Sequence, residues 1–359
     1  MKQYTMWIGT QNPKEDAGIY QFTFSEEGKI LEEPKLAAKQ PSPTYFYLSQ
    51  DGKMLYAVSE PGAGKQGLTC AYKVNPQTKE LNLFGKMPAA GRGLCHIAMD
   101  SDERYAVVTC YEEATIQVYP VDEDRRLGSL FCLRRHTGSG PVVGRQEEAH
   151  AHSATFSPDG KYLIVCDLGT DQLCVYTFNY DTGKLHRALH KNVDMPAGSG
   201  PRHMVFSPNG RYAYVACELS SQLITLSYDP EEGFAINNQQ KTLSPEFDID
   251  INYPSAIRIT RDGQDLYLSN RGEDTIAHFH VDPATGLAEH KKNYSTLGWF
   301  PRDFILTQDD QFLVAANQRS EDMVIFRRTP ESGELTLLTK ATAPEGSVAL
   351  MEVPMEDEV

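Results

Sequence analysis

Ala154-Thr-Phe-Ser-Pro-Asp-Gly-Lys-Tyr-Leu-Ile-Val165 places a Pro-Asp-Gly turn between two short apolar runs. The same unit returns with small changes at residues 46–58, 204–215 and 257–268, and in degenerate form after Ile97 and Phe304. Asp-Gly or Asn-Gly between β-rich runs is the strongest short-range signal of a hairpin, because both residues tolerate positive φ. The sequence therefore predicts a series of similar hairpins.

These hairpins recur at a nearly constant interval. Their turn positions are separated by 51, 57, 50, 53 and 47 residues, and they are Gly52, Glu103, Gly160, Gly210, Gly263 and Asp310. A second family of turns falls between them, at 27–29, 77–79, 122–124, 182–184, 231–233, 285–287 and 332–334. A period near 50 residues with four strands per unit is typical of a β-propeller blade.

The two ends of the chain supply the remaining blade. Residues 347–353 resemble an inner strand without a following turn, and residues 4–10 resemble a second strand without a preceding one. Pairing them closes a ring and leaves no exposed blade at the seam. The predicted fold is all-β, a seven-bladed β-propeller with four antiparallel strands per blade. We expect one propeller domain over residues 1–352 and an acidic tail over residues 353–359.

Charge and composition exclude several classes of partner. The net charge is −15, and a chain this acidic binds nucleic acid or anionic membranes poorly because the phosphates repel it. No stretch approaches the ~18 apolar residues of a membrane span, and the N-terminus has no signal-peptide core. The seven cysteines form no Cys-x-x-Cys pair, which favours free thiols and therefore a cytoplasmic protein. For the oligomeric state, which the sequence does not fix, we expect a monomer or a weak dimer.

The mouth of the central channel is the usual concave site of a propeller. Alignment on the turns brings two sets of positions to one rim. The inner strands begin there at Thr44, Cys95, His152, Arg202, Ser255 and Arg302. The second strands end there at Glu60, Tyr111, Leu168, Glu218, Arg271 and Gln318, each preceded by Ser59, Cys110, Asp167, Cys217, Asn270 or Asn317. Buried charges are costly unless paired or hydrated, so this polar rim predicts a functional site.

Several rim residues have side chains suited to chemistry. Arg202 and Arg302 each follow a proline and suit bidentate binding of carboxylate or phosphate. Glu218 and His152 can each serve as general base on a water molecule. His150 and His152 point to one face of a strand, as metal sites require, but no third ligand stands at a fixed local spacing. We therefore expect neither a metal nor another cofactor.

Motifs spread over essentially the whole chain show a family resemblance. They are Ile8-Gly9-Thr10 with Gly18-Ile19-Tyr20, Arg145-Gln-Glu-Glu-Ala-His-Ala-His-Ser153, Asp167-Leu-Gly-Thr-Asp171, Gly198-Ser-Gly-Pro-Arg-His203, Glu218-Leu-Ser220 and Ser269-Asn-Arg-Gly272. With them the chain resembles the seven-bladed propeller lactonases, typified by bacterial 6-phosphogluconolactonase and related to fungal carboxymuconate lactonizing enzyme. It departs from the family pattern at Ala149, usually Pro, and at Cys217, often Asn.

The resemblance implies both an activity and a set of catalytic residues. The site proposed for the lactonizing relatives matches this chain at His150 or His152, Arg202, Glu218 and Arg271. The implied reaction is hydrolysis of a small anionic sugar-acid lactone, with 6-phosphogluconolactone as the expected substrate. The substrate-binding residues expected around that set are His203, Arg302, Asn270, Asp167 and Glu60.

Two other classes of function stay open. The first is a muconate-type lactonizing enzyme, which uses the same His, Glu and Arg set in the reverse direction. The second is a non-catalytic binding platform, since a propeller fold does not fix function. A platform is expected to display apolar or aromatic rim patches, whereas this rim is charged, which favours an enzyme.

Overall fold

The turns of the repeated hairpins share one backbone conformation. In the computed structural model, which describes residues 2–14, 17–62, 65–247 and 251–354, all six turn positions adopt positive φ. The values run from +54° at Glu103 to +73° at Gly263. Glycine reaches this region without steric cost. The degenerate turns at Glu103 and Asp310 keep the same geometry, so they are true members of the repeat.

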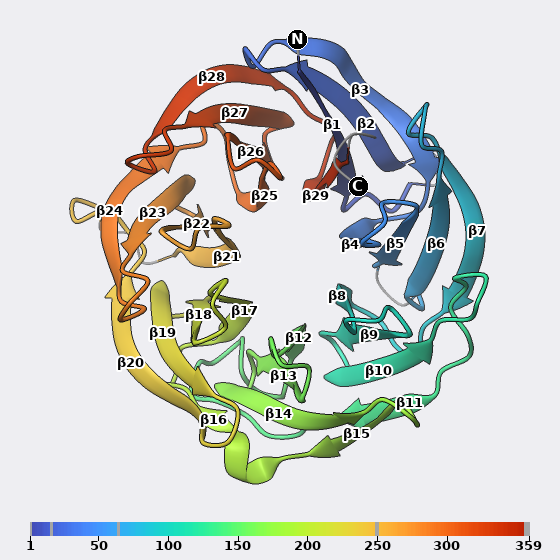
Figure 1. Cartoon of the computed structure of the whole chain (residues 1–359), viewed down its shortest axis with the longest axis vertical. Coiled ribbons are helices and arrows are strands. Elements are labelled where there is room, and N and C mark those ends of the chain that lie inside the picture. Colours follow the sequence, from blue (N-terminus) through green and yellow to red (C-terminus); the bar gives the residue numbers. More distant parts are fainter. Residues whose placement is uncertain (1, 15–16, 63–64, 248–250, 355–359) are drawn as a thin grey trace.

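The described residues form seven antiparallel sheets arranged in a ring (Figure 1). From the centre outward, blade 1 contains β4 (Pro43–Leu48), β5 (Met54–Ser59), β6 (Leu68–Val74) and β7 (Leu81–Pro88), and blade 2 contains β8 (Leu94–Met99), β9 (Tyr105–Cys110), β10 (Thr115–Pro120) and β11 (Cys132–Arg135). Blade 3 contains β12 (Ala151–Phe156), β13 (Tyr162–Asp167), β14 (Gln172–Asn179), β15 (Lys184–Arg187) and β16 (Val193–Asp194).

The other four blades follow the same inner-to-outer order. Blade 4 contains β17 (Pro201–Phe206), β18 (Tyr212–Cys217), β19 (Gln222–Asp229) and β20 (Gly233–Lys241), and blade 5 contains β21 (Tyr253–Ile259), β22 (Asp265–Arg271), β23 (Thr275–Val281) and β24 (Ala288–Ser295). Blade 6 contains β25 (Pro301–Leu306), β26 (Phe312–Asn317), β27 (Asp322–Arg328) and β28 (Leu335–Thr342). Blade 7 contains β29 (Ser347–Val353), β1 (Gln3–Thr10), β2 (Gly18–Ser25) and β3 (Ile30–Lys39). The predicted seven-bladed propeller is confirmed.

The two ends of the chain close the ring as the sequence predicted. β29 pairs antiparallel with β1, with Thr5 opposite Val353 and Ile8 opposite Leu350, so the first and last strands lie side by side in this blade (Figure 1). The Oδ2 atom of Asp303 in blade 6 accepts a hydrogen bond from the Leu350 amide at 2.9 Å. The paired strand extends to Val353, and residues 355–359 of the expected tail lie outside the described residues.

Blade 3 departs from the four-strand pattern because its outer strand is split. A 3-10 turn over Leu189–Lys191 separates β15 from β16, and both strands pair with β14. The Asn192 side chain bridges the interruption by accepting a hydrogen bond from the Val175 amide at 2.9 Å. This turn is the one helical element of the described residues, and none of them forms a helix long and apolar enough to cross a membrane.

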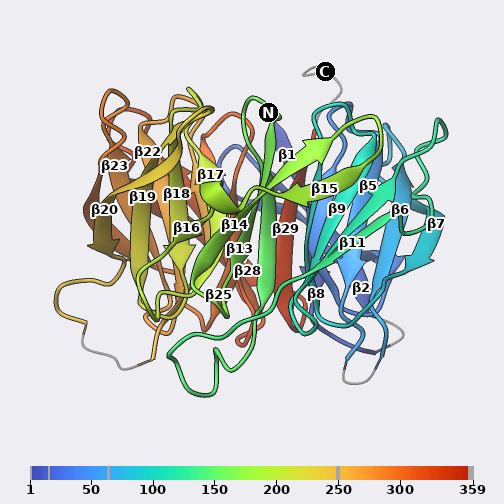
Figure 2. The same ribbon diagram turned by 90° about the horizontal axis from the view of Figure 1, so that it is seen from below.

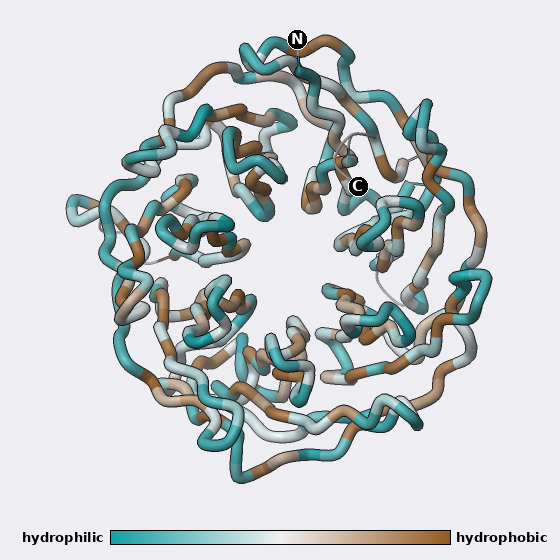
Figure 3. Tube along the Cα trace, in the orientation of Figure 1, coloured by the Kyte–Doolittle hydropathy of each residue, from teal (hydrophilic) through white to brown (hydrophobic). Residues whose placement is uncertain are grey.

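The hydrophobic core lies between the blades. Among the described residues, seven buried clusters each join two neighbouring blades; one joins Tyr4 and Phe24 of blade 7 to Phe312 of blade 6. Hydrophobic and hydrophilic residues alternate along the strands (Figure 3), as expected when side chains of a strand point to alternate faces. Longer loops project from one face, the lower one in Figure 2. This is the face at which the predicted rim lies.

Candidate active site

A cavity of about 230 Å³ occupies the channel mouth at this face. Every blade contributes to its lining. The lining residues are Gln11, Glu60, Gly93, Cys95, Tyr111, Arg145, His152, Arg202, Glu218, Arg271 and Arg302. Eight of the eleven come from the two rim columns of the sequence alignment; Gln11, Gly93 and Arg145 do not. The columns therefore converge on one cavity.

β-Bulges aim the inner-strand residues at the cavity. In blade 3 the pairing of β12 with β13 skips from Ala151 to Ser153, and His152 is the residue left over. The same shift frees Arg202 in β17 and Arg302 in β25. A bulge bends the strand and redirects one side chain, and such bulges are common beside active sites. The bulge is thus the local reason that these residues face the channel.

Glu218 is the centre of an ion-pair cluster. Arg202 Nε donates to its Oε2 at 2.9 Å, and Arg271 Nη2 donates to the same oxygen at 2.7 Å. Arg145 Nη2 contacts Oε1. Burial alone would raise the pKa of Glu218, but Arg271, Arg202 and Arg145 hold it far below its ordinary value. The carboxylate is therefore ionised at neutral pH and its oxygens are already occupied.

The structure separates the two candidate histidines. His152 is 4% exposed and lines the cavity, and its Nδ1 has no hydrogen-bond partner among the described residues. His150 lies outside the lining; its ring stacks on Tyr111 with centroids 4.1 Å apart, and its Nδ1 lies 3.0 Å from the Tyr111 carbonyl oxygen. Burial and the nearby Arg202 hold the pKa of His152 well below its ordinary value. His152 is therefore neutral at pH 7.

Glu60 and Arg302 lie on the other side of the cavity. Gln11 Nε2 donates to Glu60 Oε2 at 3.2 Å. The Arg302 guanidinium forms no ion pair or hydrogen bond with any described residue, although Glu60 is near enough for the two charges to interact. Four arginines and one firmly ionised carboxylate thus face the same space. The cavity carries a surplus of positive charge inside an acidic protein.

Three of the expected substrate-binding residues lie outside this cavity. His203 lies deeper in the central channel than the cavity. Its Nε2 lies 3.2 Å from Arg202 Nη1, and its ring contacts the rings of Tyr45, His96 and His152. The bulge explains the shift, because Arg202 takes the channel position and His203 follows it inward. His203 supports Arg202 and does not line the cavity.

Asp167 and Asn270 are likewise committed elsewhere. Asp167 is fully buried; its Oδ1 accepts hydrogen bonds from the His150, Gly169 and Thr170 amides, and its Oδ2 lies 2.7 Å from His136 Nδ1. Although burial opposes it, this contact raises the pKa of His136 to about 9. Asn270 is equally buried and bonds the backbone and hydroxyl of Thr242. Each directly precedes an aligned rim position, Leu168 or Arg271, so side-chain alternation turns it away from the channel.

The aligned columns missed three cavity residues, of which Gly93 lies only two positions before the column residue Cys95. Arg145 belongs to the loop before β12, which has no counterpart in the repeat, so no column includes it. It was visible only inside the long His-x-His motif. Gln11 directly follows β1. No hairpin turn precedes β1, so the alignment on turns could not include Gln11 in a column.

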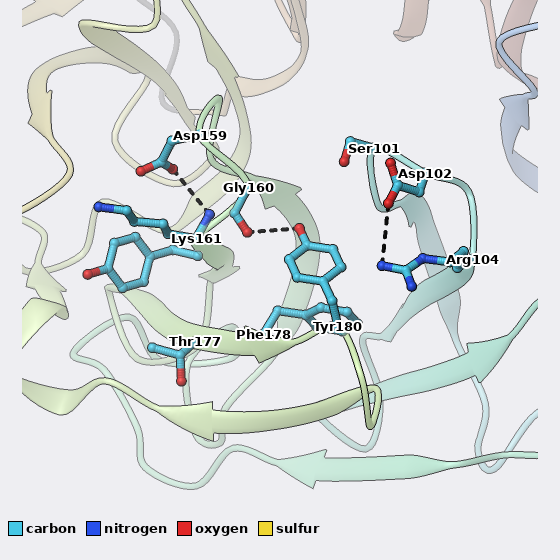
Figure 4. Close-up of a pocket in the computed structure, with 10 residues that line it drawn as sticks. Ser101, Asp102, Arg104, Asp159, Gly160, Lys161, Thr177, Phe178 and Tyr180 are labelled. Carbon is cyan, nitrogen blue, oxygen red and sulfur yellow. Dashed lines mark hydrogen bonds and ion pairs between the residues drawn. The ribbon is translucent and has the colours of Figure 1, made fainter.

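A larger hollow of about 530 Å³ lies at the periphery, between blades 2 and 3 on the opposite face (Figure 4). Its charges are satisfied locally: Arg104 pairs with Asp102 at 3.3 Å, and Lys161 pairs with Glu231 at 2.8 Å. The Tyr180 hydroxyl donates to the Gly160 carbonyl at 2.8 Å. No set of polar groups converges on one point here, in contrast to the channel mouth.

Known proteins resemble this chain over almost its full length. Residues 5–351 match the family described as Lactonase, 7-bladed beta-propeller. The chain is 37% identical over 338 residues to the 6-phosphogluconolactonase of Bacillus subtilis (strain 168). The aligned region covers 94% of this chain and 95% of the relative. The crystal structure of a protein from Lactobacillus plantarum shares 33% identity and a TM-score of 0.90, over 98% and 100% of the two chains.

A second solved structure extends the comparison. The periplasmic gluconolactonase of Pseudomonas aeruginosa shares 27% identity and a TM-score of 0.90, over 99% of this chain and 100% of that one. The resemblance inferred from the sequence motifs is thus confirmed over the whole ring. The chain belongs to the lactonase family of seven-bladed β-propellers.

Proposed function

We propose that this lactonase hydrolyses the lactone of a phosphorylated sugar acid, with 6-phosphogluconolactone as substrate and 6-phosphogluconate as product. The observation that carries the proposal is the charge of the cavity, where four arginines face one firmly ionised carboxylate. Such a site attracts a multiply charged anion by its local field, whatever the net charge of the protein. The name of the Bacillus subtilis relative supports the same substrate.

Arg302 is the proposed anchor of the phosphate group. Its guanidinium is uncommitted among the described residues, whereas Arg145, Arg202 and Arg271 already pair with Glu218. A guanidinium binds phosphate through two parallel charge-assisted hydrogen bonds, which fix orientation as well as charge. With the phosphate at Arg302, the lactone ring extends across the channel mouth towards His152 and the Glu218 cluster.

Arg202 and Arg271 are the proposed stabilisers of the developing oxyanion. Both are buried and fixed, Arg202 by Glu218 and Arg271 by Glu218 and the Tyr253 carbonyl, to which its Nε donates at 3.0 Å. Donors fixed before the reaction stabilise new charge without reorganisation, and this is usually the largest single contribution to such catalysis. Glu218 holds the two guanidiniums in place.

His152 is the proposed general base. Water attacks the carbonyl carbon, its proton passes to the neutral imidazole, and the ring C–O bond then breaks. Burial and the nearby arginines depress the pKa of His152, and a bound dianion offsets the effect of the arginines. The sequence left the role of base open between His152 and Glu218; the three guanidiniums on Glu218 favour His152.

Purified protein tests the proposal directly. The opening of 6-phosphogluconolactone is followed beside its spontaneous hydrolysis, with Arg202→Ala and Glu218→Ala in parallel. Wild-type rates no faster than the spontaneous reaction overturn the proposal. Unphosphorylated gluconolactone and a muconate-derived lactone complete the panel, because a lactonizing enzyme of the muconate type needs no phosphate.

The setting of the enzyme is part of the same proposal. All seven cysteines are buried and unpaired, which fits a reducing cytoplasm. Water and side chains suffice for the reaction as written, so it calls for no cofactor. The expected partner is the small anionic lactone.

A further inference from the structure

Two carboxyl groups line the cavity, and their surroundings are opposite. Glu218 holds three guanidiniums and stays ionised. Glu60, from blade 1, forms no ion pair with any described residue. Within the described residues its side chain has one hydrogen bond, which the neutral Gln11 amide donates at 3.2 Å. One carboxyl group is therefore fixed as an anion, and the other is free to carry a proton.

A chain of hydrogen bonds holds Glu60 in one orientation. Glu60 directly follows β5, which ends at Ser59. Its backbone N–H donates a hydrogen bond to the Ser42 carbonyl oxygen at 2.9 Å. Gln318 Nε2 donates to Gln11 Oε1 at 2.7 Å, which directs the NH₂ group of Gln11 towards Glu60 Oε2. Blades 6, 7 and 1 thus fix one oxygen of Glu60. The other oxygen, Oε1, is left without a hydrogen bond to the described residues.

Glu60 takes up a proton more readily in these surroundings than an ordinary glutamate does. Burial raises its pKa above the ordinary value, and the neighbouring Glu112 adds to the effect. Arg302 and the hydrogen bond from Gln11 oppose the shift without cancelling it. The Cys95 thiol also lies near Glu60, and burial raises the pKa of this thiol to about 12. The thiol is neutral at pH 7 and points at the His152 carbonyl oxygen, 3.0 Å away.

We propose that Glu60 is a catalytic residue, the acid that protonates the leaving ring oxygen. The inference rests on the proposed lactone hydrolysis. The water oxygen bonds to the carbonyl carbon while His152 takes a water proton. The C–O bond of the ring then breaks, and the proton of Glu60 passes to the departing oxygen, which becomes the hydroxyl group of the product. His152 returns its proton to solvent and Glu60 regains one, so the enzyme is restored.

Other proton donors in the cavity suit this step less well. Guanidinium groups do not release protons near neutral pH. Burial also raises the pKa of the Tyr111 hydroxyl, which moves it further from neutrality. An effective acid has a pKa near the working pH. Among the lining groups, Glu60 is the carboxyl group that a rising pKa brings towards that range.

Glu60→Gln tests the inference, with Glu231→Gln as the control. Glu231 pairs with Lys161 at 2.8 Å and lies outside the cavity lining. We expect Glu60→Gln to lower kcat by about 10²-fold or more with little change in KM, the size typical of a lost general acid. The wild-type kcat/KM should fall as the pH rises through the pKa of Glu60, and Glu60→Gln should lose that decline.

Two further measurements keep the test decisive. Glu60→Asp retains a carboxyl group, so it should recover part of kcat and the alkaline decline; circular dichroism shows that each variant is folded. A lactone with a phenolic leaving group needs less protonation and should show a smaller loss in Glu60→Gln. If the wild type accelerates lactone opening and Glu60→Gln keeps its kcat and alkaline decline, the role of Glu60 is overturned. A wild type that does not accelerate the reaction overturns the proposed function itself.

Discussion

Arg202 donates through Nε to Glu218 Oε2 at 2.9 Å, and both side chains are almost completely buried. Glu218 is the anionic partner of all three arginines that contact it, and within the described residues Arg145, Arg202 and Arg271 have no other. Removing one partner of a buried pair leaves an uncompensated charge. The cluster therefore stabilises the channel mouth as a unit, and its loss has a measurable cost.

Glu218→Gln should destabilise the protein in a pH-dependent way. At neutral pH we expect a loss of about 3 kcal/mol in the free energy of unfolding, because three guanidiniums lose their counter-charge. The pKa of Glu218 is depressed in the folded state. Its contribution is therefore complete above the ordinary glutamate pKa of about 4.3 and declines as the pH falls below that value. Urea unfolding of both proteins across this range measures the difference. An equal difference at neutral and acid pH would contradict the assignment.

Arg302→Ala should impair binding of phosphorylated lactones selectively. Loss of one charge-assisted contact costs about 1.5–3 kcal/mol, which corresponds to a rise in KM of about 10- to 100-fold. Unphosphorylated gluconolactone should show little change, and stability should be preserved because Arg302 is unpaired among the described residues. Steady-state kinetics with both substrates provide the comparison. Arg104→Ala, on the opposite face, is the control for a lost surface arginine. Equal effects on both lactones would place the phosphate elsewhere.

His152→Asn should lower kcat by about 10²- to 10⁴-fold, as expected for loss of a general base. His150→Asn should cause a loss at least tenfold smaller, because His150 stacks on Tyr111 outside the cavity lining. Parallel rates of lactone opening decide between the two histidines. The larger loss in the His150 variant would mean that the two residues exchange roles.

Gly9→Ala should destabilise the seam of the ring. A Cβ atom at Gly9 in β1 would lie 2.4 Å from the Pro43 carbonyl oxygen and 2.6 Å from the Phe46 ring. Overpacking of this kind costs about 1–3 kcal/mol. Gly85→Ala is the matched control, since the nearest atom to its Cβ would lie 4.0 Å away. Thermal unfolding of the two variants measures the difference, and similar midpoints would count against tight packing at the seam.

The fold was predictable because its signal is repeated. Asp-Gly and Asn-Gly turns mark four of the hairpins, and the period supplied Glu103 and Asp310, whose positive φ values confirm them. The split outer strand of blade 3 was not predictable, because it depends on one side chain, Asn192, bonding across an interruption. Lactonase membership was also predictable, since the motifs span nearly the whole chain.

The site was only partly predictable. Columns of aligned positions located Arg202, Glu218 and Arg271, since each blade repeats the same path to the rim. Columns do not reveal which way a side chain points, and Asp167 and Asn270 face away for that reason. Arg145 escaped because a loop outside the repeat carries it.

The contribution of all seven blades to the cavity has a consequence for folding. Every blade holds at least one lining residue, so a ring that lacks a blade also lacks part of the site. Lactone hydrolysis should therefore be lost on unfolding when the ring opens. It should return on refolding only after β1 pairs with β29 and closes the ring. Turnover during refolding would thus report completion of the ring, whereas circular dichroism would report individual sheets. Enzymatic activity is in this sense a probe of the cooperativity of the whole chain.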